Sequence, residues 1–146
     1  MPQQTGALTA SEDERVQAAI ALAVEARASA YARYSGFAMG AAVVAIDGRS
    51  TRGVLVENVS LGLSMCAERV ALFTAVTEAV APAVLAVCAP RTGGQLTFPC
   101  GACLQVGLEV AGAGLIVVAV DPDGVHERAP LVTLLPRAPK RHTPVT

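Results

Sequence analysis

The sequence is poor in aromatic residues and nearly balanced in charge. Its 146 residues include two tyrosines, three phenylalanines and no tryptophan, and 11 basic residues stand against 12 acidic ones, which gives a formal net charge of -1. Proteins that bind nucleic acid generally carry a basic surface, and those that bind single strands add aromatic side chains on which bases stack. We therefore expect no nucleic-acid partner.

The chain also lacks a hydrophobic run that would span a membrane, although 53% of its residues are hydrophobic. Apolar stretches such as "AGAGLIVVAV" at 111–120 fall well short of the roughly 20 residues that a membrane helix needs. The start, "MPQQTGALTASEDER", has neither the basic end nor the apolar segment of a signal peptide. We expect a cytoplasmic protein without a membrane partner. In a reducing compartment, its four cysteines would serve a metal or catalysis rather than disulfides.

The length is typical of one domain with its own hydrophobic core. We expect a single domain over residues 1–146, with tails at about 1–11 and 137–146 that are mobile or docked on a neighbouring subunit. The second tail contains Pro139 and Pro144 together with several basic residues.

Hydrophobic periodicity predicts helices that alternate with strands. Ser11 and Glu14 have the spacing of a capping box at the start of the first helix. The expected helices cover about 12–31, 66–80 and 100–112, and the expected strands cover about 39–46, 51–57, 82–90 and 114–120. This order favours an α/β layered domain with some parallel strand pairing.

Three of the four cysteines lie at or near predicted helix starts. Cys66 begins one helix, and Cys100 and Cys103 lie in the first turn of another. Backbone N–H groups and the helix dipole favour negative charge there, which lowers the pKa of a thiol, and thiolate is the form that binds metal. Three such ligands would bind Zn²⁺ and leave one coordination position open for water, as catalytic zinc sites do.

Two charged residues follow Cys66 closely. Glu68 is near enough in sequence to take a proton from a water at the open position and to deliver it to a leaving amine. Arg69 would donate to the cysteine sulfurs and withdraw charge from a centre that has three thiolates. We therefore expect Glu68 to be catalytic and Arg69 to tune the metal.

A C-x-x-C pair alone is also typical of redox dithiols and of structural zinc sites. Two other interpretations therefore stay open at this point. One is a zinc-stabilised structural module without catalysis, and the other is a redox dithiol formed by Cys100 and Cys103. A fourth protein ligand would close the site, but Cys88 lies in an apolar, β-branched run and is expected to be a buried core residue.

The joint pattern of "CAE" at 66–68 and "PCGAC" at 99–103 matches the signature of zinc nucleoside deaminases. With "YARYSGFAMGAAV", "VENVSLGLSMCAERVALFTAV" and "FPCGACLQV", the chain resembles the small homotetrameric cytidine deaminases from about residue 13 to "LLP" at 134–136. The resemblance implies a three-layer α/β/α fold with a mixed five-stranded sheet, Zn²⁺ as cofactor and a homo-oligomer, either a tetramer or a dimer. The site residues that it implies are the zinc ligands Cys66, Cys100 and Cys103, the proton shuttle Glu68 and the substrate contacts Phe37, Leu55, Glu57 and Ala67.

The substrate contacts follow from matching positions in that family. Phe37 would pack on the base, and the backbone around Ala67 would hold the pyrimidine edge. The family usually reads N-x-E-N where this chain has "LVEN", so Glu57 keeps one carboxylate for the sugar while Leu55 replaces its asparagine partner.

Further departures make the expected pocket more apolar. Leu61 stands where an aromatic residue is common, Leu104 replaces an arginine, and no phenylalanine follows "LLP". A site that hydrogen-bonds a hydroxyl discriminates through those polar groups, so their loss is expected to relax or redirect specificity.

We therefore expect a zinc-dependent hydrolytic deaminase of pyrimidine salvage. It would convert cytidine, deoxycytidine or a cytosine nucleoside analogue to the uracil form and release ammonia. An alternative substrate for the same chemistry is a modified nucleoside of the blasticidin S type or another aminated heterocycle. The non-enzymatic alternative remains a zinc-stabilised structural module.

Overall fold

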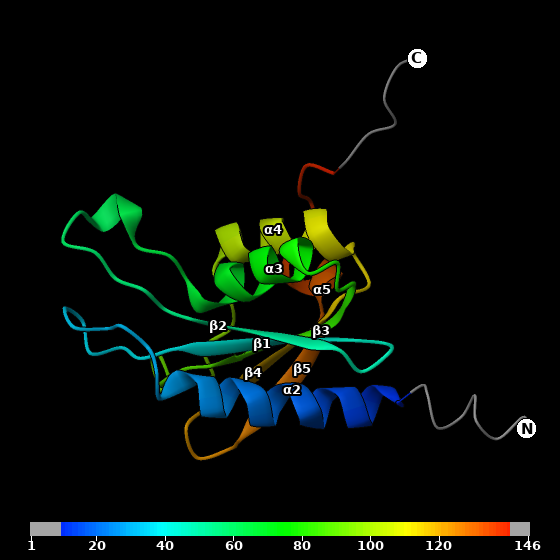
Figure 1. The fold of residues 1–146 in the computed structure, drawn as a ribbon, viewed down its shortest axis with the longest axis horizontal. Coiled ribbons are helices and arrows are strands. Elements are labelled where there is room, and N and C mark those ends of the chain that lie inside the picture. Colours follow the sequence, from blue (N-terminus) through cyan, green and yellow to red (C-terminus); the bar gives the residue numbers. More distant parts are fainter. Residues whose placement is uncertain (1–9, 141–146) are drawn as a thin grey trace, which may run out of the picture.

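A computed structural model describes residues 10–140, so the predicted tails at 1–11 and 137–146 lie mostly outside the described residues. Among residues 10–140, no helix has the length and hydrophobicity to cross a membrane. The elements, in chain order, are α2 (Glu12–Arg27), β1 (Gly40–Ala45), β2 (Ser50–Val54), the 3-10 helix η1 (Leu61–Leu63), α3 (Ala67–Thr77), β3 (Pro82–Cys88), α4 (Gly101–Ala111), β4 (Ile116–Val120), β5 (His126–Pro130) and α5 (Leu131–Leu134) (Figure 1).

The five strands form one mixed sheet in the order β2-β1-β3-β4-β5. β3 and β4 are parallel, and the other neighbouring pairs are antiparallel. Parallel neighbours need a crossover connection, and α4 lies in the one between β3 and β4. The expected parallel pairing and the mixed five-stranded sheet are both confirmed.

Helices cover both faces of the sheet. α2 lies on one face, and α3, α4 and α5 lie on the other (Figure 1). The core on the α2 side contains Val16, Ala19, Ala23, Ala42, Val44, Val84, Ala86, Cys88, Val118 and Val120. The core on the opposite side contains Ala41, Val43, Ala45, Ala67, Ala71, Leu72, Ala75, Val80, Leu85, Leu104, Leu108, Leu115, Val117 and Leu131. The three-layer α/β/α architecture is therefore confirmed.

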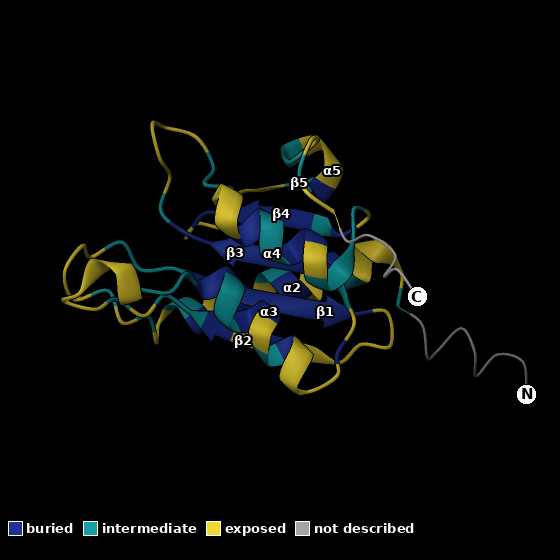
Figure 2. Cartoon of the chain, turned by 90° about the horizontal axis from the view of Figure 1, so that it is seen from above, coloured by how far each residue is buried: buried dark blue, intermediate teal, exposed yellow. Residues whose placement is uncertain are grey.

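The central strands are continuous apolar runs rather than alternating ones. β1 reads GAAVVA and is buried throughout, while β3 reads PAVLAVC and is fully buried from Val84 onward. Strands that are covered on both faces show this pattern. Figure 2 shows these strands as buried, whereas the outward surfaces of the helices are exposed. The sheet is thus a buried layer beneath α3 and α4.

Several predicted elements extend too far, including α3, which ends at Thr77 rather than 80. α2 ends at Arg27 rather than 31, and β2 ends at Val54 rather than 57. The chain around Tyr31 pairs instead with the chain after β2, where Tyr31 N–H donates to Leu55 O at 2.8 Å and Glu57 N–H donates to Tyr31 O at 2.9 Å. This pairing brings the loop after α2 beside the loop after β2.

α3 lies so close to β2 that only glycine is accommodated at position 53. A Cβ on Gly53 would lie 2.5 Å from the backbone nitrogen of Ala71 and closer still to the carbonyl oxygen of Ala67. Both atoms belong to the helix backbone, which cannot yield as a flexible side chain does. The start of α3 is therefore set by contact with the strand beneath it.

We expect Gly53→Ala to lower the free energy of unfolding by about 1–3 kcal/mol, because the added methyl forces α3 away from the sheet. Urea denaturation of the purified protein measures this change. Gly114→Ala is the matched control, since a Cβ there would meet nothing within 4 Å, and its effect should stay within about 0.5 kcal/mol. Equal stability of the two variants would contradict the close packing of α3 on β2.

Candidate active site

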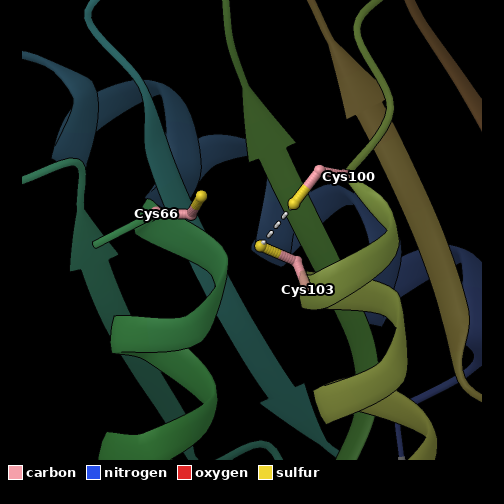
Figure 3. Close-up of side chains that lie close together, drawn as sticks. All are labelled: Cys66, Cys100 and Cys103. Atoms are coloured by element: carbon pink, nitrogen blue, oxygen red, sulfur yellow. Dashed lines mark hydrogen bonds between the residues drawn. The ribbon is translucent and has the colours of Figure 1, made fainter. Parts of the chain in front are cut away.

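Three cysteine sulfurs meet where α3 and α4 begin. Cys66 is the N-cap of α3, Cys100 is the N-cap of α4, and Cys103 lies in the first turn of α4. Their Sγ atoms all lie within 4.8 Å of one another, and those of Cys100 and Cys103 are 3.5 Å apart (Figure 3). The predicted placement of all three thiols at helix starts is confirmed.

The local backbone leaves these sulfurs available. Cys66 and Cys100 have extended backbone angles, and neither side chain makes a capping hydrogen bond to its own helix. The first N–H groups of a helix have no partner inside the helix, and together with the dipole they favour negative charge at its start. Two helix starts therefore stabilise thiolates at one place.

The thiols do not ionise independently. A hydrogen bond from the Cys103 thiol and the nearby Arg69 guanidinium lower the pKa of Cys66 to about 5. The bond to Cys66, together with burial, raises the pKa of Cys103. Cys66 thus becomes a thiolate before Cys103 does. A cation among the sulfurs would favour loss of the remaining protons, since metal binding and thiol deprotonation are linked.

Arg69 lies against this group. Its Nη2 is 3.5 Å from Cys66 Sγ, and its Nε is buried without a hydrogen-bond partner in the described part of the chain. Hydrogen bonding to the sulfurs raises the pKa of Arg69, so the guanidinium is always charged. The contact with a cysteine sulfur is the one that the sequence predicted.

Glu68 is a buried carboxyl group at the start of α3. Only 1% of its surface is exposed, and burial raises its pKa to about 7. Its Oε1 is buried and has no hydrogen-bond partner among residues 10–140. A buried acceptor without a partner costs free energy, which indicates that a water or ligand completes its bonding.

The donor set is appropriate for Zn²⁺. Three thiols are the soft ligands that zinc sites use, and the convergent group consists of Cys66, Cys100 and Cys103. Cys88 is buried in the core on the α2 side of the sheet, away from the helices that carry the three sulfurs. It is therefore not a fourth ligand. A redox dithiol would use only Cys100 and Cys103, so the convergence of Cys66 disfavours that interpretation.

The predicted substrate contacts lie at the start of α3 and on two segments that pair with each other. Ala67 is fully buried as the first residue of α3. Phe37 is half-buried in the loop between α2 and β1, and Leu55 and Glu57 are half-buried in the segment after β2. Leu104, in contrast, is part of the hydrophobic core rather than of a pocket.

Glu57 is held by the loop that precedes Phe37. Its Oε1 accepts hydrogen bonds from the backbone N–H groups of Tyr34 at 2.9 Å and Ser35 at 3.1 Å, and its Oε2 accepts one from the Ser35 hydroxyl. The hydroxyl contact is the main reason that the pKa of Glu57 is lowered. Sequence reasoning missed Ser35, although the Ser-Gly turn signal next to Phe37 marks a structured loop.

Known proteins resemble this chain in sequence and in fold. The family profile described as the cytidine and deoxycytidylate deaminase zinc-binding region matches residues 13–119. The cytidine deaminase of Halalkalibacterium halodurans is 40% identical over 116 residues, which cover 80% of this chain and 87% of that protein. The crystal structure of cytidine deaminase from Burkholderia pseudomallei has a TM-score of 0.77 and 42% identity, and the match covers 84% of this chain and 97% of that chain.

A second solved structure also resembles this chain in sequence and fold. Cytidine deaminase from Mycobacterium tuberculosis has a TM-score of 0.70 and 36% identity, with 84% of this chain and 94% of that chain covered. The range that the profile matches spans the three converging cysteines and Glu68. This chain belongs to the cytidine and deoxycytidylate deaminase family of zinc-dependent hydrolases.

Proposed function

We propose that the protein hydrolytically deaminates a cytosine nucleoside, with Cys66, Cys100 and Cys103 as the zinc ligands and Glu68 as the catalytic residue. The observation that carries the proposal is a carboxyl oxygen of Glu68 that is buried without a hydrogen-bond partner among residues 10–140, beside three convergent sulfurs. A metal that only tied α3 to α4 would not need a buried carboxyl group beside it. The geometry therefore supports an enzyme over a structural zinc module.

Zinc, when bound, supplies a Lewis acid that makes water a stronger acid and a better nucleophile near neutral pH. Glu68 takes one proton from the attacking water and passes it to the ring nitrogen as a C–O bond forms at C4 of the cytosine ring. It then takes the second proton from the new C4 hydroxyl and gives it to the amino group, so that the C–N bond breaks and the products are the uracil form and ammonia. Ala67, as the first residue of α3, offers a helix-start N–H group to the pyrimidine edge.

Substrate turnover tests the proposal directly. Cytidine, 2′-deoxycytidine and blasticidin S are incubated separately with zinc-loaded protein, and ammonia release is compared with loss of the cytosine absorbance. We expect equimolar ammonia and deaminated product from at least one cytosine nucleoside. Zinc-loaded, folded protein that releases ammonia from none of them would refute this function.

Arg69→Ala is expected to lower kcat more than it lowers zinc content. The guanidinium donates to Cys66 Sγ and so reduces the negative charge that three thiolates place on the metal, whereas it supplies no ligand itself. Losses of 10–100-fold are common when a residue that supports metal ligands is removed, and we expect this range in kcat. Metal analysis and steady-state kinetics measure the two effects, and equal proportional losses would contradict the charge-tuning role.

We propose further that the chain is a single deaminase domain that acts as a homo-oligomer in the cytoplasm, in pyrimidine salvage. Large apolar side chains are exposed on the 56–63 segment, where Val59, Leu61 and Leu63 are 79%, 82% and 69% exposed. Exposed apolar clusters often mark subunit contacts. All four cysteines are free thiols, which suits a reducing compartment.

A further inference from the structure

Two of the three sulfurs reach the site through an irregular connection. Residues 89–99 join the end of β3 to Cys100, the N-cap of α4, and we call them the β3–α4 connection. Thr92 and Gln95 exchange backbone hydrogen bonds of 2.9 and 3.0 Å across two glycines whose φ angles are 57° and 78°. This is the geometry of a two-residue hairpin turn. The connection therefore contains a small hairpin immediately before α4.

The backbone of this hairpin is not bonded to the neighbouring elements. Ala89 N–H donates to Val120 O at 3.1 Å. From Pro90 to Pro99, the backbone makes no hydrogen bond to residues outside the connection within the described range 10–140. The Thr97 hydroxyl donates to Pro90 O, but that bond also lies inside the connection. Backbone pairing therefore does not fix the connection beyond its first residue.

A hollow of about 440 Å³ lies between the β3–α4 connection and the β4–β5 turn at 121–125. Gln95 and Leu96 line one side of the hollow, and Val125 lines the other. Phe98 packs against the core on the α3 side of the sheet. Apolar contact has no directional preference, so it does not fix the orientation of the connection.

Arg91 joins the connection to the end of β4. Its Nε donates to Asp121 Oδ2 at 2.9 Å, and its Nη1 donates to Gly94 O at 3.2 Å. In the described part of the chain, this is the one side-chain hydrogen bond between the connection and another element. The donors of a guanidinium point in fixed directions. One side chain thus fixes both the base and the tip of the hairpin relative to the sheet.

Asp121 is a rigid acceptor for this contact. Its side chain is only 5% exposed. Its Oδ1 accepts hydrogen bonds from the N–H groups of Asp123 at 2.9 Å and Val125 at 3.0 Å. Removing the partner of a buried charge is strongly destabilising, whereas exposed ion pairs contribute little. The ion pair with Arg91 is therefore a firm attachment rather than a surface contact.

We propose that Arg91 and Asp121 are positioning residues for the metal centre. By fixing the connection before α4, they hold its two sulfurs at the distance from Cys66 that zinc binding requires. The approach to Cys66 is fixed differently, because Val56 and Met65 exchange backbone hydrogen bonds of 3.0 and 2.9 Å. Ligands that are held in place before binding lose less conformational freedom when they bind. This inference rests on the zinc ligands of the proposed function.

Two variants remove the ion pair from opposite sides. Asp121→Asn keeps an oxygen for the N–H groups of the β4–β5 turn, but its amino group cannot accept from Arg91. Arg91→Leu removes the donor instead. Each zinc-loaded variant is mixed with excess chelator, and zinc loss is followed over time. Outer partners of metal ligands typically contribute 10–100-fold to metal affinity, so we expect zinc loss to be about 10-fold faster or more in each variant.

Arg128→Leu is the matched control. Arg128 also forms ion pairs, with Glu12 and Asp13, but it joins β5 to α2, and neither element supplies a sulfur. This variant should lose zinc at the rate of the unaltered protein, even if its free energy of unfolding falls. Faster zinc loss of equal size in Arg128→Leu would show a general loss of stability and overturn the inference.

The double variant Arg91→Leu/Asp121→Asn tests whether the two residues act through one contact. Its zinc loss should be no faster than that of the more affected single variant, since each change removes the same interaction. Unchanged zinc loss in either folded single variant, or a double variant whose effect is the product of the two, would overturn the inference. Zinc loss is measured without substrate. Ammonia release by the unaltered protein therefore judges the proposed function separately.

Discussion

Glu68→Gln is expected to lower kcat for the accepted nucleoside by about 10³-fold or more, while the protein keeps its zinc. Glutamine has nearly the shape of glutamate, so the buried position at the start of α3 stays filled. An amide neither takes a proton from water nor gives one to a departing amine under these conditions. The three sulfurs do not include this residue, so the metal site remains intact.

The matched control is Glu78→Gln. Glu78 is the C-cap of the same helix and is exposed, so the identical chemical change occurs at the other end of α3. Its kcat should equal that of the unaltered protein. Steady-state kinetics and metal analysis of both variants measure the effect. Turnover retained in Glu68→Gln would remove the proton shuttle from this residue, and loss of zinc in that variant would show a structural role instead.

Cys103→Ala should abolish both stoichiometric zinc and activity. Cys103 is fully buried, and alanine removes one of three sulfurs that lie within 4.8 Å of one another. Two thiols and water bind zinc far less well than three thiolates, and an enzyme without its metal lacks the Lewis acid. Metal analysis after dialysis, followed by an ammonia assay, gives both results on one sample.

Cys88→Ala separates loss of a ligand from loss of packing. Cys88 is as buried as Cys103, but it lies in the core on the α2 side of the sheet. Replacing Cys88 with alanine therefore removes the same side-chain volume without altering the group of three sulfurs. We expect this variant to lose some stability and to keep its zinc. Zinc loss of equal size in the two variants would contradict the assignment of Cys103 as a ligand.

The site was predictable because its parts are local in sequence. Cys66, Glu68 and Arg69 lie within one helical turn, and Cys100 and Cys103 lie within another, so a correct helix start places each group correctly. The central strands were predictable for a similar reason, since runs such as "IVVAV" are apolar without interruption. Local patterns therefore revealed both helix starts and the sheet beneath them.

Features that depend on distant partners were not predictable in this way. β5 has the sequence HERAP, which shows no apolar alternation, and it is a strand because it pairs with the edge of β4. Its existence was implied only by the family resemblance. The contact of Ser35 with Glu57 likewise joins residues far apart in the chain. A sequence pattern does not reveal which loops will lie side by side.

The segment after β2 shows how the effect of one replacement depends on its neighbours. Leu55 was expected to halve the polar recognition of a sugar, but the structure also engages the remaining carboxylate with the loop that precedes Phe37. The two observations are independent and point the same way. We therefore expect specificity to depend on several residues of these two loops rather than on position 55 alone.

The arrangement of the sulfurs has a consequence for how the chain holds together. Cys66 precedes α3, while Cys100 and Cys103 open α4, and β3 runs between them. An ion bound by all three sulfurs would close a loop of polypeptide that contains α3 and β3. Chelators would then act as denaturants for this protein, since binding energy at such a loop is folding energy.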